Sequence, residues 1–210
     1  LKREKPDLEK IQKEITDRSS KYFYPALMKE YLSNDTTMTL DKYRRLYLGY
    51  MFQEDYDPYR PSPAPEMNSN LYHTTNPTGA QCEEIISNAR TALANNPFDI
   101  RQMSAMITAL DILGQKDLAK IWQYKLNHLL MTIVSTGTGE DEERAWYIIE
   151  PQHEYVLLNM MGYQVTNHLF YDPSYEYLTV VDVASEKKGG FSFNREPLRQ
   201  EHYRKFPDEL

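Results

Sequence analysis

The sequence predicts an α+β fold, with a mainly helical N-terminal layer and a small antiparallel sheet formed by the C-terminal third. Apolar residues recur at helical spacing in residues 1–52 and 78–137, which is typical of helices that bury one face. After residue 138 the composition changes, and two segments rich in aromatic and β-branched residues follow, as is typical of strands. We expect these parts to form a single domain over residues 1–210.

Residues 1–52 are expected to form three N-terminal helices. Asp7 opens the first of them, Pro25 is acceptable in the first turn of the second, and Thr39 caps the third. Their apolar faces are expected to contain Leu8, Ile11, Ile15, Leu27, Met28, Tyr31, Leu32, Leu40, Tyr43, Leu46, Tyr47 and Tyr50.

Residues 53–77 are expected to form a loop rich in proline and tyrosine, because a helix cannot continue through its prolines. These are Pro58, Pro61, Pro63, Pro65 and Pro77. A loop of this length is either functional or disordered. Tyr56, Tyr59, Leu71 and Tyr72 provide apolar area to anchor it, and the sequence leaves open whether residues 61–77 are ordered.

Residues 78–137 are expected to form a second group of helices. Thr78 and Asp99 are each followed three residues later by a glutamine, which is the spacing of a capping box. Gly114 follows the second of these helices and is expected to end it, because glycine reaches positive φ without strain.

The central hairpin of this group, residues 95–130, resembles one degenerate tetratricopeptide unit. Gly114 lies in the turn, Ala119 follows five residues later, and Asn96-Pro97 ends the upstream helix, which are the positions where that repeat has its turn glycine, packing alanine and proline. One unit is too few for a solenoid, which needs several stacked repeats. We therefore interpret the hairpin as a packing motif.

Residues 138–210 are expected to form a small β-containing part. Its expected elements are a strand-like segment at 145–149, a short helix at 152–161 closed by Gly162, strands at 163–170 and 175–183, a turn at 187–190 and a third strand at 191–194. The tail from residue 196 is charged and contains two prolines.

Composition excludes several classes of protein. The 24 Lys and Arg residues against 31 Asp and Glu residues give a net charge of −7, so the basic face of a general nucleic-acid binder is not expected. No apolar run approaches the roughly 20 residues that span a bilayer, so no transmembrane segment is predicted. The chain begins at Leu1, and we expect that an upstream segment has been removed.

No cofactor and no metal ion is predicted. Cys82 is the only cysteine, so neither an intramolecular disulfide nor a thiolate zinc site can form. Thr136-Gly137-Thr138-Gly139 is glycine-rich like a phosphate loop, but no Lys-Ser/Thr follows it. The acidic run Glu140–Glu143 would repel phosphate and lacks the alternating pattern of a calcium loop. A solvated linker is the favoured interpretation.

The best candidate site combines Glu150, His153, Glu154 and Tyr155, with His168 expected nearby. A histidine flanked by carboxylates could act as a general base or bind a metal ion. However, the residue four positions after His153 is a leucine, so the zinc motif His-Glu-x-x-His is absent. A structural role that holds the short helix in place is favoured, and no catalytic residue is assigned.

A second candidate site consists of Asp55, Tyr56, Asp57 and Tyr59 beside the proline-rich loop. Tyrosine faces could stack on a sugar or a peptide while the carboxylates accept hydrogen bonds. The alternative, which we favour, is that the tyrosines anchor the loop.

Several strings resemble the bacterial domain-of-unknown-function family 4919. They are Glu143-Arg144-Ala145-Trp146, Ile148-Ile149, His153-Glu154-Tyr155-Val156-Leu157-Leu158-Asn159 and Gly162-Tyr163, together with residues 47–53, 55–59 and 96–99. The resemblance covers nearly the whole chain and implies a small exported bacterial protein, periplasmic, secreted or on the cell surface, without an established activity. The proline-rich segment 61–77 is longer than in that family.

Two functional hypotheses follow. The first is a non-catalytic exported binding or interaction protein for a peptide, a glycan or another protein. The second is a hydrolase-like enzyme that uses His153 with Glu150 or Glu154. The enzyme requires a His153 side chain that solvent can reach, whereas the binding protein requires an exposed tyrosine patch around Tyr56 and Tyr59.

Overall fold

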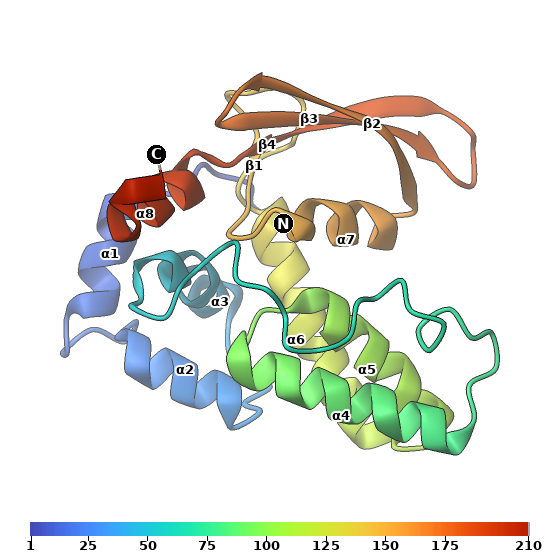
Figure 1. Ribbon diagram of the computed structural model, residues 1–210. Helices are drawn as coiled ribbons and strands as arrows, with labels where there is room; N and C mark the ends of the chain where they lie inside the picture. The colour runs from blue at the N-terminus through green and yellow to red at the C-terminus, as the bar shows by residue number, and fades with distance from the viewer. Residues whose placement is uncertain (210) are drawn as a thin grey trace. The chain divides into compact units, whose positions relative to one another are not determined.

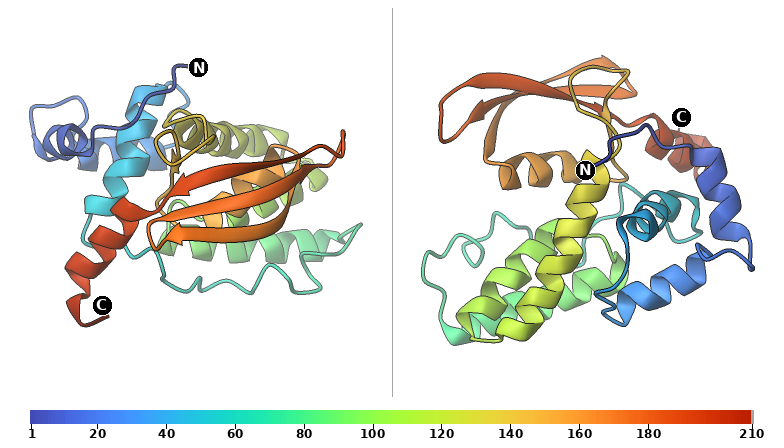
Figure 2. Two further views of the ribbon diagram at one scale, coloured as in Figure 1. Left: turned by 90° about the horizontal axis from the view of Figure 1, so that it is seen from above. Right: turned by 180° about the vertical axis from the view of Figure 1, so that it is seen from behind.

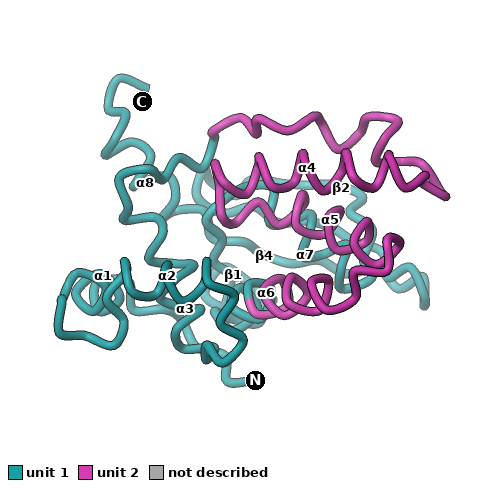
Figure 3. The backbone as a smooth tube through the Cα atoms, turned by 90° about the horizontal axis from the view of Figure 1, so that it is seen from below, with its two compact units in different colours: residues 1–59, 129–210 teal, residues 60–128 magenta. Residues whose placement is uncertain are grey.

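The computed structural model describes residues 1–209 and forms two compact units. Unit 1 contains residues 1–59 and 129–210, and unit 2 contains residues 60–128 (Figure 3). The helix α6 (Lys116–Val134) runs through the boundary between them. The α+β prediction is confirmed, because helices form most of the N-terminal two thirds and a four-stranded sheet forms in the C-terminal part (Figure 1). The single domain over residues 1–210 stays a prediction.

Unit 1 begins with three helices, α1 (Leu8–Thr16), α2 (Tyr24–Leu32) and α3 (Leu40–Gly49), followed by the 3₁₀ turn η1 (Tyr50–Phe52). Their predicted starts are confirmed: Asp7 accepts a 3.0 Å hydrogen bond from the Lys10 amide, and Thr39 accepts one of 3.3 Å from the Lys42 amide. Gly49 allows α1 and α3 to approach closely, because a Cβ there would lie 3.0 Å from the Ile15 side chain.

The sheet of unit 1 has the strand order β1-β4-β3-β2. Its strands are β1 (Trp146–Tyr147), β2 (Tyr163–Asp172), β3 (Tyr175–Asp182) and β4 (Lys188–Asn194). The three long strands are antiparallel as predicted, but the short β1 pairs in parallel with β4, so the sheet is mixed. Aromatic packing explains the addition of β1, since the Trp146 ring stacks on Phe191 at 4.9 Å and meets Phe193 at 5.6 Å.

The turn expected at residues 187–190 lies earlier, at residues 183–187, and β4 begins at Lys188. Two glycines therefore lie inside a strand. The Tyr177 ring on β3 explains one of them, because it lies so close to Gly190 that a Cβ would overlap its hydroxyl group. Glycine marks a close approach here, rather than a turn.

Two more helices complete unit 1. The helix α7 (Gln152–Met160) ends before Gly162, which has a φ of +86°, as predicted, and it covers one face of the sheet (Figures 1 and 2). The charged tail, for which the sequence indicated no helix, forms α8 (Glu196–Lys205) and the 3₁₀ turn η2 (Pro207–Glu209). Pro197 is compatible with α8 because it lies in the first turn, where its missing N–H is not needed.

Unit 2 contains residues 60–78 without helix or strand, α4 (Gly79–Asn95), α5 (Ile100–Ile112) and the first part of α6. The capping box at Thr78 is confirmed, with both reciprocal bonds to Gln81 present. Asp99 also caps its helix, but the Gln102 side chain does not complete a second box. Gly114 follows the end of α5, as predicted, and has a φ of +74°. The tetratricopeptide resemblance stays a prediction.

Among residues 1–209, no helix has the length and apolar character needed to cross a bilayer.

Candidate functional site

The helix α7 separates the main predicted site into two parts. His153 and Glu154 are neighbours in the sequence, and consecutive residues of a helix point about 100° apart. Both side chains are fully buried. The His153 ring lies against Tyr47 of α3, whereas Glu154 lies beside Glu176 of β3 and Arg195. The four residues 150, 153, 154 and 155 therefore do not form one constellation.

A hydrogen bond from Tyr47 holds the His153 ring in one tautomer. The Tyr47 hydroxyl accepts a 3.3 Å bond from the Ile149 amide and lies 2.7 Å from Nδ1 of His153. Burial raises the pKa of Tyr47 well above its usual value, so its proton is retained and donated to Nδ1. The remaining ring proton is then on Nε2, which lies 3.6 Å from a Glu150 carboxylate oxygen. The bond between the Tyr47 hydroxyl and Nδ1 of His153 fastens α7 to α3.

The Glu150 side chain also forms a hydrogen bond with a residue close to it in the sequence. It is buried, and its Oε2 accepts a 2.6 Å hydrogen bond from the Gln152 side chain. The neighbouring carbonyl of Ile149 accepts a 2.6 Å bond from the Tyr56 hydroxyl. Residues 149–153 are therefore fixed by two tyrosines of the N-terminal part.

Glu154 is a buried carboxyl group whose two oxygens make no hydrogen bond of good geometry. Burial, with the adjacent Glu176 carboxylate as the second cause, raises its pKa to about 10. Arg195 opposes this shift weakly, because its Nε is 3.9 Å from the nearer Glu154 oxygen. Glu154 is therefore protonated at neutral pH.

Glu176 is the hydrogen-bonded carboxyl group of this cluster. One of its oxygens accepts a 3.0 Å bond from Arg195, and the other lies 2.9 Å from Nδ1 of His168 on β2. The Phe170 ring covers the Arg195 guanidinium at 5.3 Å. Of this group, His168 and Phe170 are exposed to solvent.

Tyr155 completes the surroundings of the carboxyl pair. Tyr155 is 40% exposed, and partial burial together with Glu176 and Glu154 raises its pKa. The exposed groups of the cluster are therefore rings, while the two carboxyl groups lie beneath them. This arrangement stabilises a buried charge, but it does not present an acid and a base to a substrate.

Sequence reasoning missed Glu176 and Arg195. Glu176 did carry a signal, because it alternates with Tyr175 and Tyr177 and so shares a strand face with Leu178, which is buried. A glutamate in the apolar register of a strand needs a cation. Arg195 follows β4 directly, but only the pairing of β3 with β4 brings it to Glu176.

The second predicted site consists of Asp55, Tyr56, Asp57 and Tyr59, and these side chains do not form one cluster. Tyr56 is fully buried, and the Lys205 ammonium group donates to its carbonyl at 2.9 Å. Tyr59 is 47% exposed and meets the His202 ring edge-on at 4.7 Å. Asp57 accepts a bond from the Tyr59 amide, and Asp55 accepts one from the Tyr50 hydroxyl. Tyr56 and Tyr59 thus fasten this segment to α8.

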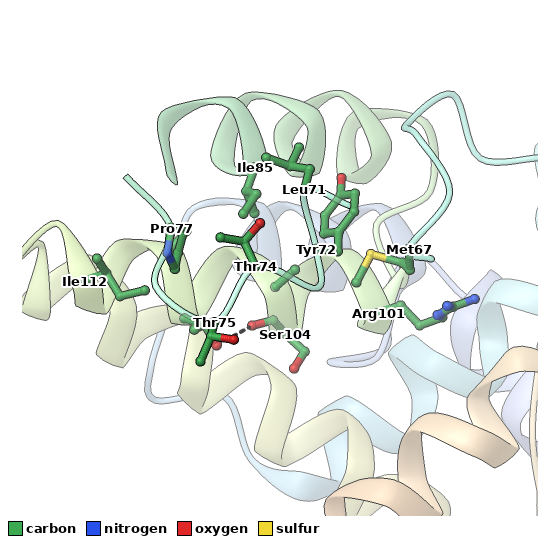
Figure 4. Close-up of a pocket in the computed structure, with 13 residues that line it drawn as sticks. Met67, Leu71, Tyr72, Thr74, Thr75, Pro77, Ile85, Arg101, Ser104 and Ile112 are labelled. Atoms are coloured by element: carbon green, nitrogen blue, oxygen red, sulfur yellow. Dashed lines mark hydrogen bonds between the residues drawn. The ribbon is translucent and has the colours of Figure 1, made fainter. Parts of the chain in front are cut away.

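A pocket of about 240 Å³ lies in unit 2, where the proline-rich segment passes over α5 (Figure 4). Apolar side chains form its walls, hydroxyl groups lie in its middle, and Arg101 lies at one end. The lining residues are Met67, Leu71, Tyr72, Thr74, Thr75, Pro77, Ile85, Arg101, Ser104, Ala105, Thr108, Ala109 and Ile112.

Gln102 fixes the segment that covers this pocket. Its side-chain oxygen accepts a 3.3 Å bond from the Tyr72 hydroxyl, and its amide group donates to the Pro65 carbonyl at 3.5 Å. Because Gln102 is buried on α5, the segment is fixed to the helix on both sides of Met67. The wall that this segment forms over the pocket is therefore held in place by hydrogen bonds.

Comparison with known protein families gives a match over most of the chain. The family model of the domain of unknown function DUF4919 matches residues 9–204. Neither a curated protein nor a solved structure matches the chain.

Proposed function

The chain belongs to the DUF4919 family, a domain of unknown function, and we propose that it is a non-catalytic binding protein. Its pocket in unit 2 receives one apolar side chain of a peptide or of a partner protein. The observation that carries this proposal is the pocket itself, with apolar walls, hydroxyl groups in the middle and a covering segment fixed by Gln102.

The size of the pocket argues for a single side chain. Pockets for drug-sized molecules measure about 300–1,000 Å³, and this one measures about 240 Å³. A Leu or Phe side chain would contact Met67, Leu71 and Ile85, while Thr74, Thr75 and Ser104 offer hydroxyl groups to the backbone of the bound segment. Such a division between apolar anchor and polar positioning groups is usual in peptide recognition.

The geometry gives little support to the alternative, a hydrolase-like enzyme. A general base must come within hydrogen-bond distance of its substrate, but His153 and Glu154 are fully buried and Glu150 is nearly so. Nδ1 of His153 already has Tyr47 as its partner. These contacts favour the non-catalytic function.

Export also belongs to this proposal. It rests on the family resemblance of the sequence, and it places the binding function in the periplasm, on the cell surface or in the medium. Fractionation of the native bacterium with an antibody against this chain tests it, with a cytoplasmic enzyme as marker. Co-fractionation with that marker would refute export without touching the pocket proposal.

The pocket is tested with the N-acetyl amides of leucine and phenylalanine as probes, by ¹H–¹⁵N NMR titration of the whole chain. We expect shifts at Ala105, Thr108 and Leu71. Ala105→Trp fills the pocket and should abolish these shifts, whereas Ala94→Trp, an exposed alanine of α4 outside the pocket, should leave them unchanged.

Two results would contradict the proposal. The first is the absence of shifts in the pocket at millimolar probe, and the second is an equal response of the two tryptophan variants. Titration with glucose and N-acetylglucosamine is the third arm. Shifts in the pocket with these sugars alone would identify a glycan-binding protein instead.

A further inference from the structure

Strand β2 is an edge of the sheet with little of the usual protection. Among residues 1–209 it pairs with β3 alone, so the backbone N–H and C=O groups on its outer side have no strand partner. Natural edge strands are commonly protected by Lys, by Pro or by bulges. Residues 163–171 contain no Lys, Arg or Pro, and the two register shifts, at 165/167 and 170/172, leave residues 167–170 regular.

The last part of this edge also carries exposed apolar side chains. Leu169, Phe170 and Tyr171 are 53%, 44% and 57% exposed. Successive side chains of a strand point to opposite faces, so a strand added at this edge would gain apolar contacts on both faces. Backbone pairing together with alternate side-chain contacts is how sheets bind extended peptides.

The charges beside this edge indicate which partner fits. Tyr171 and Tyr177 line a hollow of about 420 Å³ together with Ser192 and the acidic run Glu140–Glu143. Arg144 forms ion pairs with Glu140 and Asp141, so Glu142 and Glu143 supply the remaining negative charge. Two tyrosine rings and carboxylates together attract an ammonium or guanidinium group.

We infer that the edge of β2 binds an extended, basic segment of a partner protein, and that a Lys or Arg side chain of this segment enters the hollow. A second copy of the chain is a poorer occupant, because it carries the same net charge of −7 and the two copies repel each other. This surface lies within unit 1 and does not depend on the pocket of unit 2.

The test uses a short acetylated peptide that alternates Lys with Val, and the whole chain at low salt. We expect binding that shifts the amides of residues 167–171 and protects those that face outward from hydrogen exchange, while β3 stays unchanged. A matching peptide of alternating Glu and Val should not bind. Leu169→Lys, which adds a charge to the edge, should weaken binding.

Charge reversal provides the matched comparison. Glu142→Lys with Glu143→Lys should weaken binding by at least about tenfold, because like charges then meet in the hollow. Glu83→Lys with Glu84→Lys makes the same change in net charge on the exposed face of α4 and should leave affinity within about twofold.

Three results would overturn the inference. One is that the Lys/Val peptide does not bind or binds away from β2, and another is that the two charge variants lose affinity equally. The third is a dimer in analytical ultracentrifugation that Leu169→Lys dissociates, since this would make a second copy the occupant of the edge.

Discussion

The Tyr47 hydroxyl donates a 2.7 Å hydrogen bond to Nδ1 of His153 and so joins α3 to α7 across 106 positions of the sequence. The same hydroxyl accepts a bond from the Ile149 amide. One buried oxygen atom therefore satisfies two polar groups that no water reaches. It explains why a histidine that lies between two glutamates in the sequence is part of the core.

Tyr47→Phe should destabilise the protein by about 1–3 kcal/mol, because it leaves the Ile149 amide and the His153 ring without their partner. Urea denaturation measures the change. Tyr22→Phe is the control, since the Tyr22 hydroxyl makes no hydrogen bond among residues 1–209, and its ring instead stacks on Arg45. Equal effects of the two changes would show that the Tyr47 bond contributes nothing.

The division of α7 also shows what the sequence can and cannot predict. Helix caps and turns depend on residues that are close in the sequence, so the roles of Thr78, Asp99 and Gly114 could be predicted from the sequence. The buried pairs depend on the three-dimensional arrangement. His153 and Glu154 are adjacent in the sequence, but the turn of the helix points their side chains in different directions. The strand β3 brings Glu176 to Glu154, although the two residues are 22 positions apart in the sequence.

The parallel pairing of β1 and the last helix were missed for different physical reasons. The strand β1 contains only Trp146 and Tyr147, too few residues for alternation to indicate a partner or a direction. The helix α8 is strongly polar and contains Pro197, so its sequence shows no apolar residues at helical spacing. Its position depends on Leu198 and His202, which are buried.

The raised pKa of Glu154 predicts that the free energy of unfolding depends on pH. Its pKa is about 10 in the folded chain against the usual 4.5, so folding retains a proton that the unfolded chain loses. This contribution is fully present below pH 4.5 and is lost as the pH rises toward 10, by up to about 1.4 kcal/mol per pH unit. Glu154→Gln keeps the neutral shape and should remove this slope.

Urea denaturation of both proteins at pH 5, 7 and 9 checks this prediction. The free energy of unfolding of Glu154→Gln should exceed that of the wild type most at pH 9 and least at pH 5. A difference that is constant with pH would show that Glu154 is ionised in the folded chain.

Lys125 of α6 predicts the opposite slope. It is buried, and burial lowers its pKa from 10.5 to about 8, so the folded chain gives up this proton more easily than the unfolded one. The cost of burying the charge is full below pH 8 and falls as the pH rises to 10.5. Lys125→Met should therefore stabilise the protein at pH 7 and less so at pH 10.

Part of this gain is offset by the Trp122 ring, because the Lys125 ammonium group lies 4.3 Å from its centre and such contacts contribute about 0.5–1 kcal/mol. Chemical denaturation at the two pH values measures the balance. Lys120→Met, an exposed lysine of the same helix, is the control and should show no such dependence. A stabilisation by Lys125→Met that grows with pH would contradict the assigned direction.

Gly137 should tolerate no side chain. A Cβ at this position would overlap the Arg144 carbonyl and lie 2.9 Å from that of Ala145, and backbone atoms there cannot move aside, because the Arg144 carbonyl also accepts bonds from Thr138 and Gly139. Gly137→Ala should thus cost at least the 1–3 kcal/mol typical of overpacking. At Gly79, where a Cβ would meet only a Leu113 methyl at 3.9 Å, alanine should be neutral or stabilising by about 0.4–1 kcal/mol. Thermal unfolding of the two variants distinguishes them, and a Gly137→Ala variant as stable as Gly79→Ala would mean that the Thr136–Arg144 loop is a loose linker rather than a packed support for Trp146.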